Sequence, residues 1–199
     1  MFPKDFSFGI KGGVGFCKLA DLSDCLQPDQ QPNVSYPLGY SVGLFIENKF
    51  FYSFSMVNEL NFQNSIFQQK VYTGYEGIVD QKIKFQYLTI SALFKYQTLF
   101  LADTYFYMGP TLSYLIISEY NFNDRIYLES GEVNIKKDLP SLFTTLELGI
   151  GEKFNICNSS ILLEIKAQLE LTRFKYKKRV AIGKWNNRGL MFLLGYQIN

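Results

Sequence analysis

The sequence contains no histidine among its 199 residues and is also poor in charge. Without an imidazole, a Ser–His or Cys–His nucleophilic centre cannot form, and the commonest metal ligand is missing. Charged residues make up 19% of the chain, against about a quarter in a usual soluble domain. The net charge of +2 gives no overall indication of a polyanionic partner such as nucleic acid.

Cysteine is also scarce, with Cys17, Cys25 and Cys157 and no C-x-x-C motif. Cys17 and Cys25 are close enough in sequence to form a disulfide in an oxidising compartment. The alternative, three unpaired thiols, stays open. With no histidine and no C-x-x-C pair, we expect neither a metal site nor a cofactor.

Long apolar runs are absent too, since no stretch approaches the ~20 residues of a membrane-spanning helix. The N-terminal Met1–Lys4 has neither the apolar segment nor the cleavage site of a signal peptide. If the protein is exported, we therefore expect this sequence to be the mature chain.

What the chain does contain is aromatic residues, 19 Phe and 14 Tyr, in strictly alternating segments. In the first such segment, Phe6, Phe8, Ile10, Val14 and Phe16 fall on one face, and small or polar residues fall on the other. A period of two is typical of a β-strand with one apolar face.

The same pattern recurs and predicts eight strands in one domain covering residues 1–199. Their approximate ranges are 6–17, 38–47, 50–63, 83–97, 105–117, 142–154, 161–172 and 189–198. Short links, including a tight Asn48-Lys49 turn, alternate with four long links at about 18–37, 64–82, 118–141 and 173–188. We expect segments 64–82 and 118–141 to extend the strands as hairpins. Pro110 cannot donate to a strand ladder, so we expect a bulge there.

This arrangement predicts an all-β fold, an eight-stranded antiparallel up-and-down transmembrane β-barrel. Four long outer loops and three short periplasmic turns would connect its strands. A soluble lipocalin-like ligand-binding barrel also alternates, but with its apolar row inside, and remains an alternative.

The polar rows favour the membrane barrel because they combine glycine with charges of both signs that a closed lumen would pair. We expect Glu59 and Lys95, on adjacent strands, to form one such ion pair. The full expected lumen set is Lys11, Lys95, Lys153, Lys166, Glu59, Glu147, Glu164 and Glu170. An aromatic girdle is expected at the short-turn end, at Tyr52, Tyr96, Phe106, Phe154 and Tyr196.

Several short motifs, taken in order, resemble the PorT-like outer-membrane β-barrel family of the Bacteroidetes. They are Gly9-Ile10-Lys11-Gly12-Gly13, Asn58-Glu59-Leu60-Asn61-Phe62, Tyr87–Tyr96, Gly109-Pro110, Gly149-Ile150-Gly151 and Leu194–Ile198. The chain departs from the family at Asn58, usually Pro, and at Thr89-Ile90-Ser91, usually Glu-Ile-Pro. The resemblance implies a barrel in the bacterial outer membrane. It implies no single activity, since some members are accessory parts of secretion and gliding machinery.

We expect no enzymatic activity. A two-carboxylate mechanism on lipid, using Glu164 and Glu170, is the alternative, against the simpler role of lumen ion pairing. An eight-stranded barrel is only wide enough for its own side chains, so a diffusion pore is not expected.

The segment from Arg173 to Arg188 holds seven cations and no acidic residue, with its densest cluster at Lys175, Lys177, Lys178 and Arg179. In an outer loop, this cluster would contact anionic lipopolysaccharide or an acidic partner, or would merely balance the acidic segment Lys18–Tyr36. We expect outer-membrane lipid and other envelope proteins as partners, and no nucleic acid. The expected role is structural or accessory, in an envelope complex for secretion, gliding or outer-membrane assembly.

Overall fold

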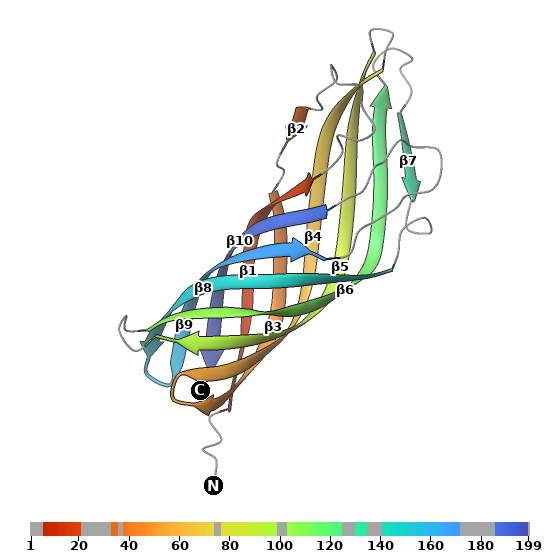
Figure 1. The fold of residues 1–199 in the computed structure, drawn as a ribbon. Helices are drawn as coiled ribbons and strands as arrows, with labels where there is room; N and C mark the ends of the chain where they lie inside the picture. The colour runs from red at the N-terminus through yellow and green to blue at the C-terminus, as the bar shows by residue number, and fades with distance from the viewer. Residues whose placement is uncertain are drawn as a thin grey trace.

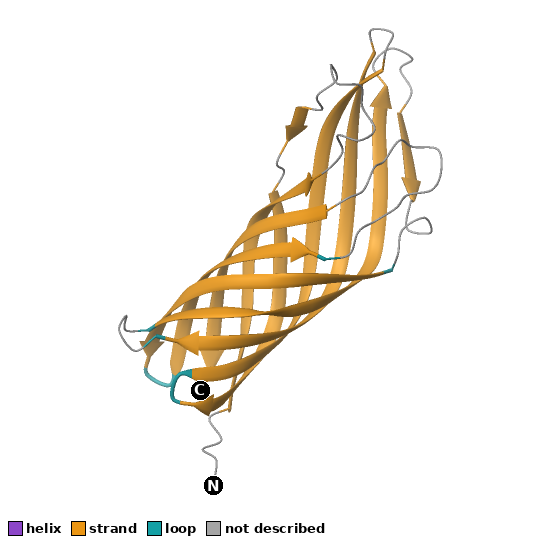
Figure 2. Cartoon of the chain, in the orientation of Figure 1, coloured by secondary structure: helices purple, strands orange, loops and turns teal. Residues whose placement is uncertain are grey.

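The fold is all-β and forms a single tilted barrel, with strands projecting beyond one end (Figure 1). The computed structural model describes residues 6–20, 33–35, 38–73, 77–98, 103–124, 130–134, 141–171 and 186–198. Figure 2 shows strands and turns throughout this part of the chain. None of the described residues forms a helix long and apolar enough to cross a membrane.

Eight long strands, each antiparallel to its neighbours, close the barrel in the order β1-β3-β4-β5-β6-β8-β9-β10. Their bounds are β1 Phe6–Ala20, β3 Leu38–Phe51, β4 Phe54–Thr73, β5 Gly77–Gln97, β6 Thr104–Asp124, β8 Leu142–Ile156, β9 Ser159–Glu170 and β10 Asn186–Ile198. The ring closes where β1 pairs with β10, from Phe8–Ile198 to Ala20–Asn186. The predicted eight-stranded up-and-down topology is confirmed.

The predicted tight turn at Asn48-Lys49, between the second and third expected strands, was wrong. The β3–β4 ladder continues through Asn48–Met56 and Lys49–Ser55 and ends at Phe51–Phe54, so the turn is Tyr52-Ser53. Asn48 and Lys49 keep regular pairing within β3, and a register irregularity follows them, between Lys49 and Phe51, just before the turn.

Three strands run well past the barrel wall, as the expected hairpin extensions predict. The β4–β5 ladder reaches Thr73–Gly77, and β6 continues to Asp124 beside β5 (Figure 1). Two short strands flank this extension: β2, Asn33–Ser35, pairs with β4, and β7, Ser130–Asn134, pairs with β6.

The expected bulge at Pro110 was also wrong. The pairs on either side, Ser91–Thr111 and Phe94–Met108, keep the same register, and the two positions between them are not paired in the ladder. The strand thus accommodates Pro110 by losing local pairing rather than by inserting a residue. The register shift in this ladder lies at Gln86–Tyr87 instead.

The two faces of the barrel wall differ sharply in polarity. Outward apolar residues of β9 and β10 are all exposed: Leu163 48%, Ile165 43%, Leu169 39%, Phe192 45% and Leu194 58%. The five residues of the expected girdle are exposed as well. Because the apolar row is outside and the charged row inside, the lipocalin-like alternative does not fit.

Candidate functional site

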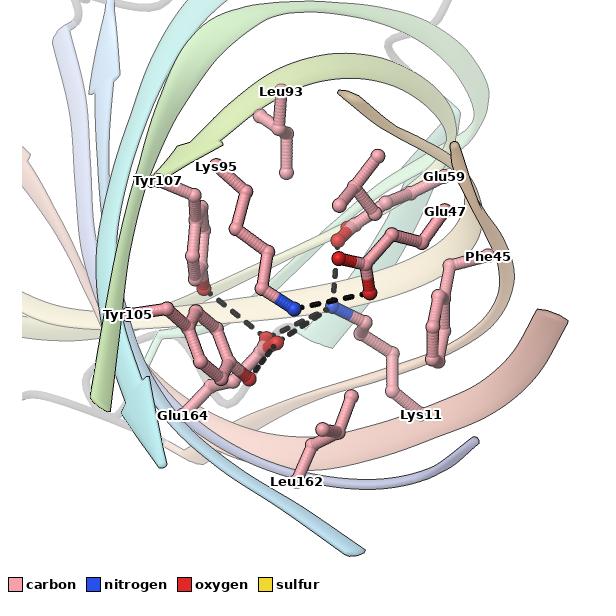
Figure 3. Close-up of a pocket in the computed structure, with 11 residues that line it drawn as sticks. Lys11, Phe45, Glu47, Glu59, Leu93, Lys95, Tyr105, Tyr107, Leu162 and Glu164 are labelled. Carbon is pink, nitrogen blue, oxygen red and sulfur yellow. Dashed lines mark hydrogen bonds and ion pairs between the residues drawn. The ribbon is translucent and has the colours of Figure 1, made fainter. Parts of the chain in front are cut away.

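The lumen holds a network of buried ion pairs, contributed by strands far apart in the sequence (Figure 3). The ammonium Nζ of Lys11, on β1, lies 2.6 Å from a Glu59 carboxylate oxygen of β4 and 2.9 Å from Glu164 of β9. Lys166 lies 3.2 Å from both Glu59 and Glu147. These five side chains tie β1, β4, β8 and β9 together across the interior.

A second pair lies nearer the short-turn end. Lys95 Nζ of β5 is 3.0 Å from Glu47 Oε2 of β3, and it sits 3.9 Å above the Tyr105 ring centre. Ser55 and Gln197 donate hydrogen bonds to the Glu47 carboxylate at 2.7 and 2.9 Å. The Glu47 charge is therefore compensated by a cation and two neutral donors.

The predicted Glu59–Lys95 pair is wrong, although both residues are buried in the lumen. The β4–β5 register places Ser91 opposite Glu59 and Ser55 opposite Lys95, so the two charges sit at different heights. Each binds another strand's residue instead: Lys95 binds Glu47, and Glu59 binds Lys11 and Lys166.

The other expected lumen charges are mostly placed as predicted. Lys11, Lys95, Lys153, Lys166, Glu59, Glu147 and Glu164 are all buried. Glu47, 2% exposed, was missed because the predicted strand ended at that residue. Its alternation with Phe45, Gly43 and Ser41 was the available indication that it faces inward. The side chain of Glu170 lies outside the described residues.

Apolar and aromatic side chains fill the space around the charges. A buried cluster comprises Phe45, Val57, Leu93, Tyr105, Tyr107 and Leu162. The hydroxyls of Tyr105 and Tyr107 donate to Glu164 at 2.8 and 3.2 Å. The cavity among these side chains measures about 10 Å³, which is room for about one water molecule.

The contacts of Glu164 argue against a two-carboxylate reaction on lipid in the lumen. Glu164, one member of the conceivable catalytic pair, is 6% exposed and already accepts bonds from Lys11, Tyr105 and Tyr107. A general acid or nucleophile must reach its substrate, and this carboxylate is enclosed by the lumen. Among the described residues, no group of three or more Cys, Asp or Glu is arranged to hold a metal ion.

The side chains of the remaining predicted site residues lie outside the described part of the structure. The basic cluster at Lys175, Lys177, Lys178 and Arg179 lies outside the described residues, as does Cys25. Cys17 lies on β1 but its side chain is not described. Cys157, in the two-residue turn between β8 and β9, is an exposed free thiol.

Comparison with known proteins gives one family match. The profile of the family described as "Outer membrane protein beta-barrel domain" matches residues 2–175. No curated protein sequence matches the chain significantly.

Several solved outer-membrane barrels resemble the fold at low identity. Neisserial surface protein A (NspA) of Neisseria is 10% identical with a TM-score of 0.48, over 97% of this chain and 96% of that one. Ail of Yersinia pestis is 13% identical with a TM-score of 0.47, over 96% and 98% of the two chains. OprG of Pseudomonas aeruginosa is 15% identical with a TM-score of 0.47, over 98% and 96%.

Proposed function

Because the chain belongs to the outer membrane protein beta-barrel domain family and lies in the bacterial outer membrane, we propose that it is a closed, non-catalytic membrane anchor. Its role is accessory: the barrel fixes the projecting strands and the short turns at defined positions for other envelope proteins. The finer relationship to PorT-like accessory proteins of secretion or gliding machinery is part of this proposal.

The sealed lumen is the observation that carries the proposal. Lys11, Glu59, Glu164 and Lys166 cross the interior with ion pairs of 2.6–3.2 Å, and in the described part of the lumen the cavity among the charged side chains, about 10 Å³, is too small for a substrate. A lumen filled in this way supports neither a diffusion pore nor a lipid-modifying centre within it. What remains available for function is the surface.

The projecting strands offer such a surface. Beyond the barrel wall, β4, β5 and β6 form a continuous sheet, flanked by β2 and β7 (Figure 1). The partly exposed Lys84–Glu119 pair, at 3.3 Å, links β5 and β6 within this extension. A hydrogen-bonded sheet that projects beyond the barrel suits contact with a protein partner better than a mobile loop does, because less conformational entropy is lost on binding.

Co-purification tests the proposal. The protein is tagged in its native cell, extracted in mild detergent, and compared with a variant in which a flexible linker replaces residues 68–82 at the tip of the β4–β5 hairpin. We expect the unmodified protein to bring down a defined set of envelope proteins and the variant to lose it. Turnover of phospholipid or lipopolysaccharide by the pure protein, with no co-purifying partner, would overturn the proposal.

We further propose that the cluster Lys175, Lys177, Lys178 and Arg179 contributes to binding an anionic partner on the outer side. Each cation near an anionic surface adds about 1 kcal/mol, and salt weakens this attraction. Changing all four to Gln should leave the barrel folded and reduce co-purifying lipopolysaccharide or acidic protein. Added salt should have the same effect on the unchanged protein. Equal co-purification in the Gln variant, at both low and high salt, would show that the cluster does not contribute to binding.

A further inference from the structure

One polar side chain interrupts the apolar outer wall of β4. Asn58 is exposed on the outward row between Met56 and Leu60. Among the described residues, none hydrogen-bonds to its amide. The residue lies four positions above Phe54, or about 9 Å along the membrane normal for a 45° tilt and 3.3 Å per residue. An amide at this depth faces hydrocarbon, which can neither donate nor accept a hydrogen bond.

A backbone carbonyl beside Asn58 also lacks a donor. Ala92 of β5 lies directly opposite Asn58, and Pro110 of β6 lies opposite Ala92 in the next ladder. The backbone N–H of Gln97 donates to Ser53, and that of Leu115 donates to Ser141. The backbone N–H and C=O groups of successive residues point to opposite neighbouring strands. Those of odd-numbered residues therefore point from β5 to β4 and, up to Leu115, from β6 to β8. The even-numbered Ala92 and Pro110 therefore point at each other, and Pro110 has no N–H to offer.

The surroundings allow close approach. Ala92 and Pro110 are short side chains on the outward row beside Asn58, which is itself exposed. Immediately toward the short turns, an outer groove of about 390 Å³ runs over β4, β5, β6 and β8. Its outward walls are Phe54, Phe94, Tyr96, Phe106, Met108 and Leu148. We call Asn58, Ala92 and Pro110, with this groove, the wall notch.

Lipid gives no compensation for these groups, whereas a protein surface does. In membranes, small residues that permit close packing and polar side chains that bond across the contact are the features of protein–protein interfaces. An amide both donates and accepts, so Asn58 is complementary to a second Asn58. A two-fold axis along the membrane normal brings the same patch of two copies together.

We propose that the wall notch is the docking site for a second copy of this chain within the membrane. The two Asn58 amides bond to each other, and the aromatic walls of the two grooves interlock. The proposal is independent of the anchor function, since it concerns the lipid-facing wall and not the projecting strands or turns.

Cysteine crosslinking in lipid vesicles tests this contact with Asn58 kept intact. In a background with Cys17, Cys25 and Cys157 changed to Ser, Met56→Cys places a thiol one outward position from Asn58. The control, Leu163→Cys, is 48% exposed on β9, four strands away around the ring. With purified protein in excess lipid, we expect oxidation to link Met56→Cys into dimers and to leave Leu163→Cys monomeric.

Asn58→Leu in the Met56→Cys chain then tests the role of the amide. We expect the crosslinked fraction to fall by about five- to tenfold, which corresponds to two membrane hydrogen bonds per dimer. The protein should stay folded, as shown by its shifted gel mobility before heating. Equal crosslinking at positions 56 and 163, or no change with Asn58→Leu, would overturn the proposal. Crosslinking of Met56→Cys to a different protein in native membranes, with no homodimer in vesicles, would overturn it as well.

Discussion

At the scale of single residues, the lumen lysines Lys11, Lys95 and Lys166 are each held by one or two carboxylates from other strands, so one substitution leaves a charge buried without its partner. Lys95→Met removes the cation 3.0 Å from Glu47 and should lower the free energy of unfolding by about 3–5 kcal/mol. The double variant Lys95→Met/Glu47→Gln should lose clearly less than the sum of the two single losses, because both charges are then gone.

The matched control uses Glu59, whose partners are Lys11 and Lys166. Lys95→Met combined with Glu59→Gln should be closer to additive, because these two side chains share no ion pair. Urea unfolding in lipid vesicles measures all the variants. Coupling as large for Lys95 with Glu59 as for Lys95 with Glu47 would show that the pairing described above is incorrect.

Adjacent residues on β9 should respond in opposite ways to the same charge. Leu169 is exposed on the outer wall, so Leu169→Arg should cost about 2–4 kcal/mol if it faces hydrocarbon. Gln168, which donates to Glu147 at 2.7 Å, points inward, and Gln168→Arg should act by crowding the network. Spin labels at the two positions measure this directly. A spin label at position 169 that is broadened by water-soluble but not by lipid-soluble quenchers would contradict the outward orientation of Leu169.

The alternation of residue types was enough to predict which side chains face inward, because a period of two leaves little choice once one face is apolar. Lys11, Lys166, Glu147 and Glu164 were identified in this way. Partners were not predictable, since they depend on strand register and on the tilt of the barrel. Glu59 and Lys95 share a lumen and adjacent strands, yet the register sends them to different partners.

At the scale of elements, the turn between β8 and β9 carries an unfavourable residue. Cys157 adopts a positive φ of 52°, a region that costs most residues about 1–2 kcal/mol and costs glycine little. Cys157→Gly should therefore stabilise the barrel by about 0.5–1 kcal/mol in the same unfolding measurement.

Asp103, at φ 68° between β5 and β6, provides the comparison for this turn. Its carboxylate accepts a hydrogen bond from Asn155 at 3.4 Å, and Asp tolerates this conformation better than Cys does. Asp103→Gly should give a smaller gain or none. A loss of stability in Cys157→Gly would mean that the turn does not hold residue 157 in this conformation.

The β5–β6 ladder depends on a glycine beside its proline. A Cβ at Gly109 would lie 2.1 Å from the Ala92 carbonyl oxygen, so Gly109→Ala must push the two strands apart. We expect a loss of about 1–3 kcal/mol. At Gly12 a Cβ would meet nothing closer than 3.5 Å, so Gly12→Ala should be tolerated. Equal losses at the two positions would contradict the close approach of β5 and β6.

Strand existence followed from the sequence, but strand ends did not. Asn48-Lys49 has the composition of a turn, yet the ladder continues to Phe51–Phe54 and the turn is Tyr52-Ser53. Two polar residues are tolerated there because they lie near the end of the barrel rather than in its middle. That misplaced turn is also why Glu47 was missed. At Pro110, pairing on both flanks held the register, so the strand lost bonds instead of forming a bulge.

At the scale of the whole molecule, the absence of long apolar runs together with repeated alternation was sufficient for the fold. A chain that must expose an apolar face to lipid and satisfy its backbone has few solutions besides a closed barrel. The function was harder to predict from the sequence than the fold. The lumen charges are a property of the fold, and the surfaces that remain for partners differ among barrels of the same architecture.

The lumen is sealed by its own side chains, and ion conductance across a planar lipid bilayer tests this most directly. The purified, folded protein should insert without opening a steady conductance, because Lys11, Lys166, Glu59 and Glu164 bridge the interior and leave a cavity of about 10 Å³. A variant with these four changed to Ala should, if it folds, leak measurably. A stable ohmic channel formed by the unmodified protein would contradict the sealed lumen and the anchor function built on it.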